Sequence, residues 1–226
     1  EVLRTPGAPR VVITVFLEGV VLLGGLAFVA THLIQSRGAS TPVAGAMFFA
    51  VSAGGVIFAF FARRIVPVLG EARLAALGTL VITLSVLGIA WAPALAAAPL
   101  TCFGAGLGFY MLHNTLQTNA TQMAPTRRGT AVALFASIFF LGQSVGVAVA
   151  GRLAEGIGTS WTLTISALAM LPVAEEYKKL LLVEPAVADS ITGDKWNKYI
   201  FRTGRNSSQD AISNAVALDK AGVTTA

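Results

Sequence analysis

Charged side chains are scarce in this chain of 226 residues. Asp, Glu, Lys and Arg together make up 12% of the sequence, whereas hydrophobic residues make up 55%. An ordinary soluble domain carries about 25% charged residues. With a mean hydropathy of +0.73, the chain has too little polar surface for a soluble fold of this size. The composition therefore indicates a membrane protein.

Cysteine is nearly absent, because Cys102 is the only one in the sequence. This excludes a disulfide within the chain and a cysteine-based metal cluster. No basic segment precedes a short apolar core at the start, so we find no signal peptide. The sequence begins with Glu1 rather than Met, and we expect the natural N-terminus to lie upstream.

The charges that are present change in kind along the chain. Residues 1–174 contain nine Arg and no Lys, whereas residues 175–226 contain five Lys and two Arg. The arginines of the first part stand between apolar runs and form no stripe with aromatic residues, which argues against a nucleic-acid-binding surface. The change from Arg to Lys indicates a boundary between two domains, 1–174 and 175–226.

The first domain is predicted to be an all-α polytopic membrane domain with six transmembrane helices. A helix that crosses the hydrocarbon core needs about 20 predominantly apolar residues. Six runs approach this length, at residues 11–34, 42–62, 73–92, 94–118, 130–150 and 159–174. The segments 35–40, 63–73, 124–129 and 151–158 are expected to be loops. On one side these loops and ends carry nine Lys and Arg, against two on the other, which places the N-terminus and residues 175–226 in the cytoplasm.

Small residues are expected to pack these helices together. Gly142, Gly146 and Ala150 recur every four residues and form one small-residue face, which allows close approach of helices in a bilayer. The motif GAGLG at 104–108 lies inside an apolar run with no strand before it, so it is not expected to be a dinucleotide-binding loop.

Two segments of the first domain resemble the major facilitator superfamily in its bacterial drug-efflux branch. APTRRGTAVALFASIFFLGQSVGVAVAG, at 124–151, resembles the tenth loop and eleventh helix, and FARRIVPVLGEARLAALG, at 61–78, resembles the basic loop after the eighth helix. On this resemblance the six runs are helices seven to twelve. The conformational-loop candidates are Arg63, Arg64, Arg73, Arg127 and Arg128.

The resemblance implies a fold of two six-helix halves with a substrate cavity between them, of which this chain supplies one. It implies secondary transport of small organic molecules, as a proton-coupled exporter (an antiporter) in the bacterial inner membrane. The implied partners are the lipid bilayer, a small-molecule substrate, protons, and either a missing N-terminal half or a second copy. Half of a cavity cannot alternate access alone, so an inactive membrane fragment is an open alternative.

Glu18 is the acidic residue deep inside an apolar run, and a charge in the hydrocarbon costs about 2.5–3.5 kcal/mol or more. It is therefore a candidate proton-coupling carboxylate, or a counter-charge for a cationic substrate. The alternatives are a position near the headgroups or a pair with Arg10. His32 stands at the other end of the same run and is expected at the membrane interface.

Further polar residues lie within the apolar runs. Tyr110 and Asn114 are four residues apart and share a helical face, and His113 lies beside them. These residues, with Gln143 and Ser144, are candidates to line a substrate cavity, with hydrogen bonding between helices as the alternative. No spacing typical of a nucleophile with its base, or of metal ligands, is present, so we expect no enzyme, no metal and no cofactor.

The second domain has the pattern of an incomplete α/β segment. KLLLVEP (179–185) and KYIFRTG (198–204) are typical of short strands, and an apolar stripe after Asn206 predicts a helix. Residues 175–218 resemble an internal piece of the periplasmic substrate-binding proteins of branched-chain amino acid ABC transporters, most specifically at FRTGRNSSQ (201–209). Two families that function in different compartments suggest a chimera, an artificial join of reading frames. An amino-acid-binding module on a membrane anchor remains an alternative.

Overall fold

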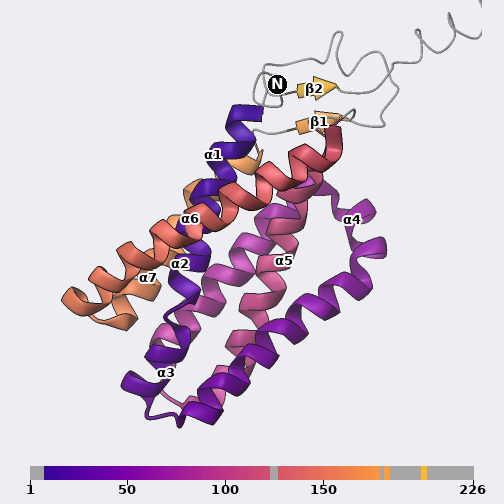
Figure 1. The fold of residues 1–226 in the computed structure, drawn as a ribbon. Helices are drawn as coiled ribbons and strands as arrows, with labels where there is room; N and C mark the ends of the chain where they lie inside the picture. Colours follow the sequence, from indigo (N-terminus) through magenta and orange to yellow (C-terminus); the bar gives the residue numbers. More distant parts are fainter. Residues whose placement is uncertain (1–7, 123–126, 179–180, 184–199, 203–226) are drawn as a thin grey trace, which may run out of the picture.

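The computed structural model describes residues 8–122, 127–178, 181–183 and 200–202. Its helices run side by side as an elongated bundle (Figure 1). α1 begins at the end of the bundle where α7 finishes, and both short strands lie at that end as well (Figure 1). The helix predicted after Asn206 lies outside the described residues.

The first apolar run forms a helical segment that is interrupted in its middle. It consists of α1 (Ala8–Glu18), the π-helix η2 (Gly19–Leu23), α2 (Gly24–Leu26) and α3 (Val29–Arg37). Between α2 and α3, Phe28 leaves the helical region with φ −93° and ψ 1°. α3 ends at Gly38, which has a φ of 67°, a left-handed conformation that glycine adopts without a steric penalty.

The next helix, α4 (Thr41–Trp91), corrects one expectation from the sequence. Residues 63–73 were expected to form a loop. They are helical except at Gly70, which has φ 70° and ψ 162° and forms the kink where the two helices of α4 meet. The physical reason is that the segment is apolar between its charges. Ile65, Val66 and Leu69 pack against the buried side chains of Phe58, Leu74 and Met111.

The rest of the bundle is formed by three long helices. A short 3₁₀ turn, η3 (Leu95–Ala97), leads into α5 (Ala98–Gln122), and α6 (Arg128–Ile157) and α7 (Thr159–Lys178) follow. Residues 151–157 were also expected in a loop but continue α6 as far as Gly158, whose φ of 83° ends the helix. Two strands, β1 (Leu181–Val183) and β2 (Ile200–Arg202), pair in parallel.

Four helical segments of the described chain are long and apolar enough to cross a membrane. They begin at Ala8, Thr41, Leu95 and Arg128, and a shorter apolar helix spans Thr159–Val173. The count differs from the six predicted runs for two reasons. The second and third runs both lie within α4, whose two helices meet at a kink at Gly70, and the sixth run is shorter than a full span.

The helices contact one another through glycines where the backbones come closest. The predicted small-residue face is confirmed, because Gly142, Gly146 and Ala150 are buried on α6. A Cβ atom added to Gly146 would overlap the carbonyl group of Val20, and one added to Gly19 would overlap the carbonyl oxygen of Phe139. This close contact fixes η2 directly against α6.

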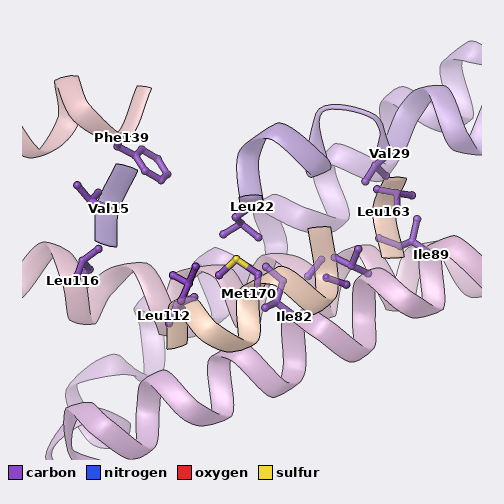
Figure 2. Packing of buried hydrophobic residues seen from close by; sticks show 14 of the residues in the cluster. Val15, Leu22, Val29, Ile82, Ile89, Leu112, Leu116, Phe139, Leu163 and Met170 are labelled. Carbon is purple, nitrogen blue, oxygen red and sulfur yellow. The ribbon is translucent and has the colours of Figure 1, made fainter. Parts of the chain in front are cut away.

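Larger side chains fill the space between the other helices. Figure 2 shows Val15 of α1 between Phe139 of α6 and Leu116 of α5. Near the middle of the bundle, Met170 of α7 lies beside Leu112 and Ile82 (Figure 2). The buried core is therefore continuous from α1 to α7 and holds the first helical segment against α5 and α6.

Candidate functional site

Glu18 is the last residue of α1, directly before the π-helix η2. Its side chain is fully buried, with 0% exposure. A π-helical turn inserts an extra residue into a helix and often marks a functional site. The helix geometry thus changes at Gly19, one residue after the buried carboxylate.

His113 of α5 is the partner of this carboxylate. Its Nδ1 lies 3.2 Å from both Oε1 and Oε2 of Glu18. An imidazole N–H at Nδ1 can donate to either oxygen of an ionised carboxylate, which only accepts. The side chain of His113 is 15% exposed and that of Glu18 is 0% exposed, so the pair is largely shielded by protein.

Three phenylalanines surround the imidazole ring. The ring centroids of Phe109, Phe135 and Phe139 lie 5.1, 5.3 and 4.6 Å from that of His113. Phe109 comes from α5, as His113 does, whereas Phe135 and Phe139 come from α6. In such an apolar setting a substitution that removes one partner leaves the polar group of the other without compensation.

A cavity of about 240 Å³ lies beside the pair. Its lining comes from the interrupted first segment, from α4 and α5, and from Gln143 of α6. Most lining side chains are apolar, and Ser52, Tyr110 and Gln143 add polar groups. Phe109 belongs both to this lining and to the rings around His113. One aromatic side chain therefore connects the cavity with the Glu18–His113 pair.

The six residues proposed from the sequence as substrate or proton-coupling candidates fall into three groups of two. Glu18 and His113 form the pair, and Tyr110 and Gln143 line the cavity. Asn114 is half-buried and is not part of the cavity lining. Ser144 is exposed, and its hydroxyl donates to the carbonyl oxygen of Phe140 on its own helix, at 2.9 Å.

The five arginines proposed as conformational-loop residues all have exposed side chains. Arg63, Arg64 and Arg73 lie on α4, on both sides of the non-helical Gly70. Arg127 is the N-cap residue of α6, and Arg128 is the first residue of that helix. They lie at the surface of the described bundle, apart from the cavity lining.

A second buried polar cluster surrounds His32. This residue was expected at the interface, but its side chain is 0% exposed within the protein. Its Nε2 lies 3.0 Å from the carbonyl oxygen of Ile89, and its Nδ1 lies 2.9 Å from Oγ1 of Thr159. Since the carbonyl can only accept, Nε2 carries a proton. His32 thus joins α3 to α4 and to the start of α7.

Sequence reasoning missed the partners of both histidines. It proposed Glu18 as a proton-coupling carboxylate or a counter-charge for a cationic substrate, with a pair to Arg10 or a position near the headgroups as alternatives, and it did not connect Glu18 with His113, which was already a candidate on another helix. The available signal was that an ionisable group within the membrane usually pairs with another one. The three phenylalanines gave no signal, because aromatic residues are common throughout apolar runs.

The family model of the Major Facilitator Superfamily matches residues 1–147. The chain belongs to this superfamily. The match ends within α6, and it includes Glu18, His113 and every residue that lines the cavity.

Comparison with solved structures agrees with the family match on the fold of the chain. A crystal structure of the peptide transporter POT in complex with sulfate matches with a TM-score of 0.62 and 18% sequence identity, over 94% of this chain and 43% of that chain. The chain therefore spans less than half the length of that transporter. At this identity the likeness establishes the fold alone. A search of curated proteins finds no match.

Proposed function

We propose that residues 1–174 form the C-terminal half of a secondary transporter of the drug-efflux type, which exports small organic molecules in exchange for protons. The observation that carries the proposal is the buried Glu18–His113 pair, which shares Phe109 with an apolar cavity. Membership of the superfamily supports transport across a membrane. The chain has no proposed catalytic role, metal or cofactor.

The pair offers a physical basis for proton coupling. A proton that binds to the carboxylate of Glu18 removes its negative charge and with it the attraction to His113. The two side chains are then free to separate, so protonation favours one arrangement of α1 and α5 over the other. A substrate in the cavity contacts Phe109 and biases the same equilibrium. Two ligands that bias one equilibrium are thermodynamically coupled.

The proposed topology has six crossings in a bacterial inner membrane. Gly70 divides the 51-residue α4 into two arms, and α7 supplies the last crossing. The excess of basic residues places the N-terminus and residues 175–226 in the cytoplasm. Alternating access requires a second six-helix unit, which is either a separate N-terminal half or a second copy of this chain.

Residues 175–226 are proposed to be a fragment joined to the transporter as a chimera rather than a working module. A strand pair with three residues in each strand is much smaller than an independently stable sheet. The alternative is an amino-acid-binding module on a membrane anchor. Calorimetric titration of the intact chain with leucine, isoleucine and valine separates the two, because saturable heat requires the module.

Transport in cells tests the main proposal. We expect bacteria that express the intact chain to accumulate less N-phenyl-1-naphthylamine than control cells, with the difference lost when the proton gradient is dissipated. Glu18→Gln should abolish this difference. Glu155→Gln, at an exposed position on α6, is the matched control and should retain it. Proton-dependent export that is unchanged by Glu18→Gln would refute the proposed role of the pair.

A further inference from the structure

We propose that the cavity accepts an uncharged, largely aromatic molecule, and that it discriminates against anions, zwitterions and cations. This inference rests on the proposed transport function and specifies the substrate class for the same site. The observation behind it is a contrast between two adjacent parts of the site. The ionisable pair is enclosed by rings, whereas the cavity itself is lined by groups that carry no charge.

The cavity lining favours ring stacking over ionic contact. Phe48, Phe109 and Tyr110 contribute aromatic rings from α4 and α5, and Met47 adds a thioether. Phe109 and Tyr110 stand edge to face, with centroids 5.1 Å apart and an interplanar angle of 70°. Such a wall attracts a flat ring by dispersion and by its quadrupole. Methionine adapts to ligands of irregular shape.

The absence of charge from the cavity lining also selects between neutral and charged ligands. No Asp, Glu, Lys, Arg or His is present among the described residues that line the cavity. A ligand ion without a counter-charge in an apolar pocket loses hydration that nothing replaces. The nearest proposed counter-charge for a cation, Glu18, is fully buried outside the lining and faces His113. A free peptide, which carries charge at both ends, finds no partner for either end here.

The polar groups of the lining suit a neutral ligand with one polar substituent. Ser52, Tyr110 and Gln143 offer hydroxyl and amide groups, which both donate and accept hydrogen bonds. These groups come from three different helices. A phenol, an alcohol or an amide can be held by them without an ionic partner, so the cavity has specificity for uncharged polar ends.

Tyr110 also limits the width of the cavity. Its ring lies over Gly55 of α4 so closely that a Cβ atom at Gly55 would overlap the ring atoms. Gly55 therefore allows Tyr110 to lie back against α4. A larger residue at this position would push the ring away from α4 and change the width of the binding site.

Calorimetry with a matched set of two-ring ligands tests the proposal. The intact chain in lipid nanodiscs is titrated with 2-naphthol, 2-naphthoate and 2-naphthylmethylamine, which present one ring system as a neutral molecule, an anion and a cation at neutral pH. Alanyl-alanine serves as the zwitterion. We expect saturable binding of 2-naphthol, at least tenfold weaker binding of both ions, and no binding of the dipeptide. Empty nanodiscs correct for partition into lipid.

Variants locate the binding event. Ser52→Trp fills the cavity and should weaken 2-naphthol binding at least tenfold. Val56→Trp is the matched control, because Val56 lies one turn further along α4, is 67% exposed and does not line the cavity. It should bind as the unaltered chain does. A circular-dichroism melt of each variant checks that it is folded.

Three results would overturn the proposal. The first is an affinity for 2-naphthoate, alanyl-alanine or the ammonium ligand equal to or above that for 2-naphthol. The second is non-saturable 2-naphthol uptake equal to that of empty nanodiscs, which shows partition into lipid and no binding to the protein. The third is equal binding by Ser52→Trp. Binding is measured without a proton gradient, so these outcomes are independent of the Glu18→Gln transport experiment.

Discussion

Glu18 and His113 are separated by 95 residues in sequence, yet Nδ1 of the histidine lies 3.2 Å from both carboxylate oxygens. The two residues come from helices α1 and α5, and Phe109, Phe135 and Phe139 surround the imidazole ring. The pair therefore joins the first helical segment to the helix that forms one wall of the cavity. Its role in stability can be tested separately from its proposed role in transport.

The first prediction concerns the coupling within this pair. His113→Gln should lower the free energy of unfolding by about 3–5 kcal/mol, because a buried charge that loses its partner is left uncompensated. Glu18→Gln should cost less, since a neutral imidazole is easier to bury than a carboxylate. The double variant should cost less than the sum of the two. Reversible unfolding in mixed micelles with SDS measures all three, and simple additivity would show that the residues do not interact.

The second prediction concerns the contact between η2 and α6. Gly146→Val introduces side-chain atoms where the carbonyl group of Val20 lies. We expect a loss of at least about 1–3 kcal/mol in the free energy of unfolding, the usual cost of overpacking. Gly156→Ala, on the same helix with open space at the Cβ position, is the control. It should leave the stability unchanged or slightly higher. Equal effects of the two substitutions would contradict the close packing.

The third prediction concerns the buried cluster around His32. His32→Phe leaves the hydroxyl of Thr159 and the carbonyl of Ile89 without this hydrogen-bonding partner. We expect a loss of about 1–3 kcal/mol for each polar group left unsatisfied. Ser36→Ala removes only a part-buried contact of 3.2 Å to Thr159 and should cost less. SDS-induced unfolding again provides the measurement, and a His32→Phe variant as stable as the original chain would exclude a structural role for the cluster.

The fourth prediction concerns the bend inside α4. Gly70 has φ 70° and ψ 162°, a region that is essentially restricted to glycine. Gly70→Ala should therefore lower the midpoint of thermal unfolding, at a cost of about 1–3 kcal/mol. Gly129→Ala serves as the control, because Gly129 is helical and its Cβ position is open. If the midpoint of thermal unfolding of Gly70→Ala equals that of Gly129→Ala, the bend does not depend on glycine.

Particular residues show where prediction from sequence succeeded. The apolar run at 94–118 corresponds closely to α5, and the spacing of Gly142, Gly146 and Ala150 predicted the buried face of α6. Both follow from local rules, since hydrophobic length and helical periodicity act within a single helix. The loop at 151–158 was wrong, because residues 151–157 continue α6. The loop at 63–73 was wrong in extent, because the break between two helices is confined to Gly70 and the residues on both sides of it are helical.

The candidate site was predicted only in part, for a related reason. Glu18 was recognised because a carboxylate in an apolar run is costly wherever the helix packs. Its partner depended on the rotation of α1 relative to α5 and α6, and this rotation is set by the contacts of Gly19 and Gly146 with neighbouring backbones. The same holds for His32, whose partners Ile89 and Thr159 lie 57 and 127 residues away.

Composition and the length of the apolar runs were enough to identify this chain as a helical membrane protein with an acidic residue inside an apolar run, because they decide which solvent surrounds each segment. Three features required the folded structure: the contact of Glu18 with His113, the helical conformation of the basic residues on both sides of Gly70, and the uncharged cavity beside the pair. These features depend on how helices distant in sequence pack together, and that packing follows from side-chain shape over the whole bundle.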